Sequence, residues 1–111
     1  MDQVHRRVEV EAEIDRGYSY ARWKELEKVA VRTMDELEGR GSVYRDPSFV
    51  GVRYTVLDDL DRGDSVFIPA QYGLQHSRAA AIGKAKQSGW SIVTRKTFEG
   101  GKWGVRIFRL A

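Results

Sequence analysis

The side chains of this chain that are best suited to chemistry are basic and lie near its C-terminus. Two runs of alternating β-branched, aromatic and basic residues flank Gly100 and Gly101. A glycine pair can take the positive φ angles of a two-residue type I′ turn, so we predict a β-hairpin over residues 90–110. Basic side chains on a two-stranded ribbon can contact phosphates or guanine edges in a major groove. The hairpin therefore indicates nucleic-acid binding.

A two-residue turn also fixes which residues face each other. It pairs Glu99 with Lys102 and places Arg95 opposite Arg106. Like charges that are directly opposite destabilise a strand pair unless an anion or an acidic neighbour compensates them. A three-residue turn would instead shift one strand and move the two arginines to opposite faces.

Three interpretations of this basic region are open. In the first it binds nucleic acid, with DNA as the expected ligand, through Arg95, Arg106, Lys102, Lys96 and Arg109 of the hairpin and Arg78, Lys84 and Lys86 of the preceding segment. In the second, Arg95 or Arg106 pairs within the molecule with an acid of the first predicted strand, namely Glu9, Glu11 or Glu13. In the third, the basic region binds an acidic protein. We adopt the first as the working hypothesis.

The distribution of charge supports a polyanionic partner at the C-terminal end. Residues 1–60 carry ten Lys/Arg and thirteen Asp/Glu, a balance of −3, whereas residues 61–111 carry nine and three, a balance of +6. The chain is expected to form one compact domain over 1–111, with a possible subdivision into an acidic half, 1–60, and a basic half, 61–111.

The pattern of apolar residues predicts the elements that position these side chains. Strands are expected over 4–14, 49–57 and 64–69, helices over 19–38 and 75–88, and the hairpin after them. The order β-α-β-β-α-β-β predicts an α+β fold, with a mostly antiparallel sheet covered by two helices. The first helix is expected to be the main core element, because its apolar residues recur at helical spacing: Trp23, Leu26, Ala30, Met34 and Leu37. The strand over 49–57 is expected to be central in the sheet.

Catalytic chemistry is poorly represented. The chain has no cysteine and only two histidines, His5 and His76, which lie about seventy residues apart. The carboxylates occur on strand faces and at helix ends rather than as an isolated pair among apolar residues. We therefore expect no enzyme activity, no metal site and no cofactor.

Targeting features are also missing from the pattern of the sequence. The first residues lack the hydrophobic core of a secretory signal, and the purely apolar runs are only a few residues long. We expect a cytoplasmic protein without membrane contact. Exposed edge strands in so small a protein make a homodimer an additional expectation.

The C-terminal half resembles a known group of proteins. The segment Gly63–Leu110 contains G-D-S-V-F-I-P, a helix ending in small and basic residues, T-R-K, a glycine turn and G-V-R-I-F-R-L. It resembles small uncharacterised tailed-phage and prophage proteins that have a G-D-S-aromatic-aromatic-V-P motif and a closing R-V-W-R, with Phe108 where that pattern has Trp. The resemblance implies a phage accessory factor acting in the bacterial host cell, and it implies no catalytic residue.

The acidic side chains suggest an alternative function. An acidic face for a basic partner is predicted at Glu9, Glu11, Glu13, Asp35, Glu36 and Glu38. Phage accessory factors include inhibitors of host enzymes as well as DNA-binding regulators. The alternative is therefore an inhibitor of a host nucleic-acid-processing enzyme, such as an anti-CRISPR or another anti-defence factor, that acts by protein-protein contact.

Overall fold

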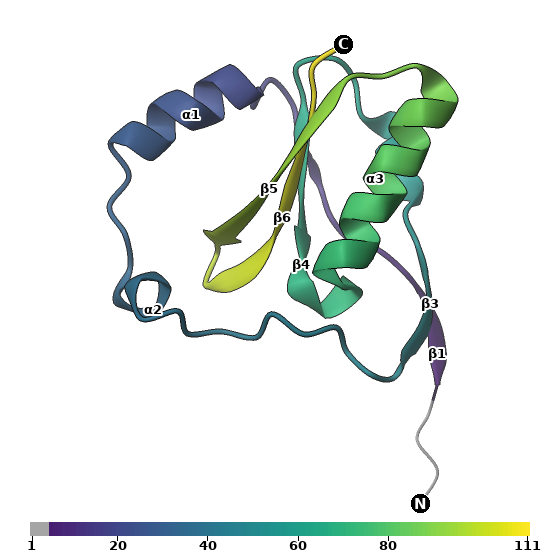
Figure 1. Cartoon of the computed structure of the whole chain (residues 1–111), viewed down its shortest axis with the longest axis horizontal. Coiled ribbons are helices and arrows are strands. Elements are labelled where there is room, and N and C mark those ends of the chain that lie inside the picture. The colour runs from purple at the N-terminus through teal and green to yellow at the C-terminus, as the bar shows by residue number, and fades with distance from the viewer. Residues whose placement is uncertain (1–4) are drawn as a thin grey trace, which may run out of the picture.

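The computed structural model describes residues 5–111, which form an α+β fold as the sequence predicts (Figure 1). Its strands are β1 (Arg6–Glu9), β2 (Ile14–Asp15), β3 (Phe49–Arg53), β4 (Ser65–Pro69), β5 (Ile92–Glu99) and β6 (Lys102–Arg109). Its helices are α1 (Tyr20–Lys28), α2 (Met34–Leu37) and α3 (Leu74–Ser88), with 3-10 turns at Thr55–Asp59 and Ala70–Tyr72.

The main sheet has four strands in the order β2-β4-β6-β5, and all its neighbours are antiparallel. The C-terminal hairpin has the predicted two-residue turn, with φ angles of 57° at Gly100 and 77° at Gly101. Arg95 therefore pairs directly with Arg106, which confirms the predicted register. Because β6 lies between β4 and β5, the hairpin is an integral part of the sheet.

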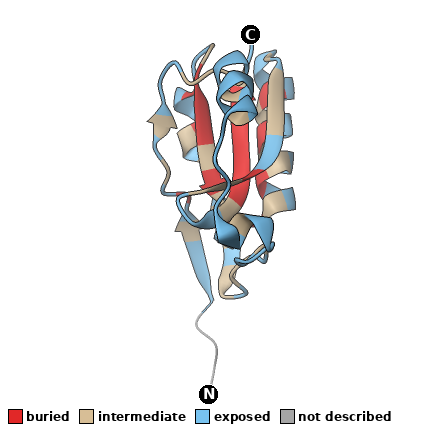
Figure 2. Cartoon of the chain, turned by 90° about the vertical axis from the view of Figure 1, so that its left-hand side faces the viewer, coloured by how far each residue is buried: buried red, intermediate tan, exposed pale blue. Residues whose placement is uncertain are grey.

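The core lies between this sheet and α3. Side chains that alternate along β4 and β6 are buried on the face toward α3, including Ile68 and Val105, and Ala81 meets them from the helix. Small residues on α3 allow the helix to lie close to the strands. Figure 2 shows the buried residues concentrated on the strands of the sheet, with exposed residues on the segments around them.

Helix α1 covers part of the opposite face. The ring centroid of Phe108, which is fully buried on β6, lies 5.3 Å from that of Tyr20 and 5.5 Å from that of Trp23. Two helices thus cover the sheet, as the sequence predicts, and the structure places them on opposite faces.

The expected helix over 19–38 is wrong in its length and in its role. Helix α1 ends at Lys28, and α2 is a separate helix whose N-cap is Thr33, with the Thr33 side chain accepting a hydrogen bond from the Glu36 amide at 3.1 Å. The β-branched residues Val29, Val31 and Thr33 disfavour a continuous helix across this segment. Leu26, Met34 and Leu37, which were expected in the core, are exposed.

The N-terminal strands also differ from the expectation. The run over 4–14 divides into β1 and β2, which belong to different sheets, and residues 1–4 lie outside the described part. Strand β3 is shorter than predicted and is not central, since it pairs in parallel with β1 in a separate two-stranded sheet. Its apolar residues, such as Phe49 and Val52, pack against the edge of the core instead.

Candidate nucleic-acid interface

Arg106 is a structural residue. It is only 4% exposed, and its Nε and Nη2 donate to the two carboxylate oxygens of Glu99 at 2.8 and 2.5 Å. Its Nη1 donates to Asp15 Oδ2 at 2.7 Å and to Ser65 Oγ at 2.8 Å. The intramolecular interpretation therefore describes Arg106, but its partners are Asp15 and Glu99 and not the acids predicted from the first strand.

The surroundings of Arg106 keep it charged. Burial by itself would lower the pKa of the guanidinium, but the hydrogen bonds that it donates to Glu99 and Asp15 outweigh that effect and raise the pKa. The guanidinium carbon also lies 4.8 Å from the ring centroid of Tyr18 and 5.9 Å from that of Phe67. A cation with this many internal partners is not available to an external anion.

Arg95, directly across the hairpin, is exposed and contacts no carboxylate within residues 5–111. Its Nη2 donates to the Tyr20 hydroxyl at 2.8 Å, and its Nη1 donates to the Thr94 carbonyl at 2.9 Å. The Nζ of Lys24 lies 4.7 Å from the same Tyr20 ring. Helix α1 therefore contributes a second cation at the Tyr20 ring. The sequence prediction did not include Lys24, because it assigned this helix to the core.

Two more of the predicted cations have internal partners. The Nζ of Lys84 lies 2.8 Å from Asp58 Oδ1, and Arg109 donates from Nη1 to the Leu60 carbonyl at 2.8 Å. Arg109 also lies over Trp90, with 4.1 Å between its guanidinium carbon and the ring centroid. These contacts tie α3 and β6 to the rest of the fold.

The remaining predicted cations are Arg78, Lys86, Lys96 and Lys102. Across the described range 5–111, no acidic side chain lies within ion-pair distance of any of them. Lys96 pairs with Val105 across the hairpin, so its side chain is on the sheet face that α3 covers, where its Nζ lies 4.9 Å from the Trp103 ring centroid. Arg78 and Lys86 are on α3 itself. The structure thus brings Arg78, Lys86 and Lys96 to one side of the sheet.

The hairpin cannot enter a major groove as a free ribbon, contrary to the expectation from the sequence. Strand β6 is bonded to β4 along its other edge, and α3 and α1 lie against the two faces. Only the outer edge of β5 and the turn remain open.

Helix α3 presents an exposed face without acids. None of its fifteen residues is acidic, and its exposed residues are Gln75, His76, Ala79, Ile82, Gly83, Lys86, Gln87 and Ser88. The space around Gly83 is open, since an added Cβ would meet no atom within 4 Å. The absence of acids over residues 74–88 can be read from the sequence, and it could have indicated this exposed face. Of this helix, the sequence prediction named only the basic residues Arg78, Lys84 and Lys86.

The residues assigned to an acidic face do not form one surface. Glu9 lies on β1, and Glu11 and Glu13 follow it, whereas Asp35, Glu36 and Glu38 lie at α2, on the opposite side of the molecule (Figure 1). Several of them have internal partners as well: Glu36 pairs with Arg32 at 2.7 Å, and Glu9 accepts a hydrogen bond from the Thr55 amide at 3.0 Å.

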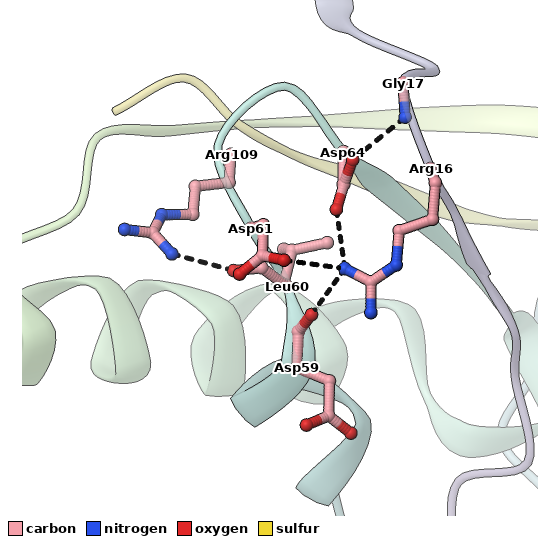
Figure 3. Close-up of polar contacts among 7 residues, drawn as sticks. All are labelled: Arg16, Gly17, Asp59, Leu60, Asp61, Asp64 and Arg109. Carbon is pink, nitrogen blue, oxygen red and sulfur yellow. Dashed lines mark hydrogen bonds and ion pairs between the residues drawn. The ribbon is translucent and has the colours of Figure 1, made fainter.

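The G-D-S motif that carries the resemblance to phage proteins holds the fold together (Figure 3). Asp64 is 6% exposed and accepts hydrogen bonds from the Gly17 amide at 2.9 Å and from Arg16 Nη1 at 2.6 Å. Burial opposes its ionisation, but these hydrogen bonds prevail and lower the pKa of Asp64. Ser65, the next residue, contacts Arg106. Asp64 and Ser65 thus link β4 to the segment after β2 and to β6.

Comparison of the chain with protein-family models, with curated proteins and with solved structures finds no match. None of the described helices is long and apolar enough to span a membrane. Within residues 5–111, no three His, Cys, Asp or Glu side chains are grouped so that they could hold a metal ion.

Proposed function

We propose that the protein is a DNA-binding accessory or regulatory protein that places helix α3 in a major groove. The observation that carries this proposal is that a fifteen-residue helix on the outside of the sheet has no acid and exposes amide, small and basic side chains. Glutamine amides can pair with adenine edges, and lysine can reach guanine or phosphate oxygens.

The dimensions of α3 suit this role. Fifteen residues span about 22 Å, and a major groove about 12 Å wide admits a helix. Ala79 and Gly83 on the exposed face would allow the helix backbone to approach the base edges closely. Gln75 and Gln87, near the two ends of the helix, would then be the side chains that read bases.

The free cations supply the contacts to the DNA backbone. Lys86 and Arg78 extend from α3, and Lys96 lies on the neighbouring strand β5 on the same side of the sheet, whereas Arg95 extends from the opposite face. With about three phosphates neutralised, log K for duplex DNA should fall with log salt with a slope of roughly −3.

A salt titration tests this proposal directly. A labelled mixed-sequence duplex of about 20 base pairs, which is longer than α3 at about 3.4 Å per base pair, is titrated with the protein at several salt concentrations. We expect binding for which log K falls with log salt at about the slope given above. Binding that is absent at low salt, or that does not depend on salt, would contradict the proposal.

A further inference from the structure

Strand β5 is the last strand of the main sheet, and one of its two edges has no neighbouring strand (Figure 1). The two-residue turn makes Glu99 and Lys102 a hydrogen-bonded pair, so alternate residues from Glu99 back to Val93 direct their backbone groups toward β6. The residues between them direct their backbone N–H and C=O groups outward. These outward-facing residues are Ile92, Thr94, Lys96 and Phe98.

The outer edge of β5 is almost free of internal contacts. Arg95 Nη1 donates to the Thr94 carbonyl oxygen at 2.9 Å. Within residues 5–111, no other backbone group of Ile92–Glu99 makes a hydrogen bond outside the pairing of β5 with β6. Unpaired backbone groups on an edge strand are a template for another extended chain. The edge of β5 can therefore accept a further strand.

The side chains of β5 disfavour pairing with a second copy of the same strand. If two β5 strands pair antiparallel about a twofold axis through their outer edges, the two registers with the greatest overlap are centred on Arg95 and on Lys96. Each of these registers places a cation directly opposite its own copy, and like charges that are directly opposite are destabilising. The strand that fits this edge therefore has a different sequence.

The surroundings of this edge are basic. Strand β6 and helix α3 each contain three Lys/Arg and no acid, and α1 contains three Lys/Arg and two Asp/Glu. On β5 itself the one acid, Glu99, is bonded through both carboxylate oxygens to Arg106. Arg95 and Lys96 have no carboxylate within ion-pair distance in the described range 5–111. A segment that pairs with β5 therefore meets two uncompensated positive charges.

We propose that the outer edge of β5 binds an extended acidic segment of another protein, which adds to the main sheet as a further strand. Arg95 and Lys96 are consecutive, so their side chains lie on opposite faces of the sheet. Two consecutive Asp or Glu residues in the added strand would place one carboxylate beside each cation. The backbone groups would supply affinity and the cations would select an acidic partner. Only Lys96 is shared with the DNA contacts proposed above, and the proposal does not rest on them.

The experiment uses three synthetic peptides of eight residues, the length of β5. The first has Glu-Glu at the centre of alternating Thr and Val, and the second has Gln-Gln in its place. The third keeps Glu-Glu but has a proline on each side of it, so that each edge of the peptide strand loses one backbone donor. Binding of each labelled peptide to the full chain is measured by fluorescence anisotropy at about 0.15 M salt, where surface electrostatics are screened beyond roughly 8 Å. We expect the first peptide to bind at least about tenfold more tightly than either of the others.

Matched substitutions locate the binding site. Thr94→Pro removes an outward backbone donor without removing a bond to β6, and should weaken binding of the first peptide by at least about tenfold. Arg95→Gln keeps every backbone group of β5 and tests the charge separately, with an expected loss of about fivefold. Arg62→Gln is the control and should leave the affinity unchanged, because this exposed arginine lies in the turn before β4, on the far side of β6 from the edge.

Four results would overturn the proposal. Equal binding of the first two peptides would show that the edge does not select acids. Equal binding of the first and third peptides would show attraction of charges without strand pairing. Equal losses in the Arg95→Gln and Arg62→Gln variants would place the peptide elsewhere on the basic surface. A dimer of the unmodified protein, seen by sedimentation without peptide and converted to a monomer by Thr94→Pro, would assign the edge to a second copy of the chain.

Discussion

Arg95 lies directly opposite Arg106 across the β5–β6 hairpin, yet the two guanidinium groups have opposite roles. Arg106 is buried and bonded to Glu99 and Asp15, whereas Arg95 is exposed beside Tyr20. The like charges are tolerated because two carboxylates neutralise the buried member of the pair. One arginine is thus part of the fold, and the other is free to contact a polyanion.

Replacing each arginine by alanine should separate these roles. Arg106→Ala leaves Asp15 and Glu99 without their partner, so we expect it to lower the free energy of unfolding by about 2 to 4 kcal/mol. Arg95→Ala should change stability by no more than about 0.5 kcal/mol and leave DNA binding nearly unchanged, because Arg95 lies on the sheet face opposite α3. Urea unfolding and binding isotherms measure both quantities. Equal stability of the two variants would contradict the assignment.

Acid unfolding should report on Asp64. Its pKa is lowered in the folded protein, so its ionised carboxylate stabilises the fold at neutral pH. This stabilisation is lost as the pH falls below about 4, the ordinary range of an aspartate, toward the lowered pKa. Asp64→Asn should therefore be less stable at pH 7 and show a weaker loss of stability between pH 4 and pH 2. Thermal unfolding over that pH range gives the comparison, and parallel curves for both proteins would refute the role of Asp64.

Two glycine-to-alanine changes should have opposite effects. A Cβ at Gly104 on β6 would lie 2.5 Å from the Ile68 carbonyl oxygen and 2.5 Å from a ring carbon of Phe67, so the strands would have to shift. We expect Gly104→Ala to destabilise the protein by more than about 2 kcal/mol. A Cβ at Gly83 in α3 meets open space, and Gly83→Ala should stabilise by about 0.5 to 1 kcal/mol through helix propensity. Melting temperatures of the two variants test both predictions. A Gly104→Ala variant as stable as the unmodified protein would contradict the packing of β6 against β4.

The parts of the fold that the sequence predicts are those set by local chemistry. The glycine pair at 100 and 101 determines the turn, and the turn determines the register as far as Arg95. The bounds of α3 follow from its small and apolar residues and from Gly89, which ends the helix in the left-handed conformation. These features need no knowledge of distant contacts.

The parts that could not be predicted depend on distant contacts. Leu26, Met34 and Leu37 have helical spacing, but the spacing does not say whether another element will cover them, and in the described structure none does. The pairing of Arg106 with Asp15 was missed for the same reason, because 91 residues separate them in the sequence. Glu99 is only seven residues from Arg106 and lies on the same face of the hairpin, so the predicted register already made it a candidate partner. The pairing of β3 with β1 likewise depends on where the whole chain places them.

The central claim is that the exposed face of α3 binds duplex DNA, and Gly83 allows the most direct test. Gly83→Glu adds a negative charge to that face, whereas Gly83→Gln adds a side chain of similar shape without the charge. Both substitutions replace a helical glycine in open space, so both variants should fold. The measurement is the affinity of each variant for the same mixed-sequence duplex at a fixed low salt concentration. We predict that the glutamate variant binds at least about tenfold more weakly than the glutamine variant. Equal affinities of the two variants would contradict the claim.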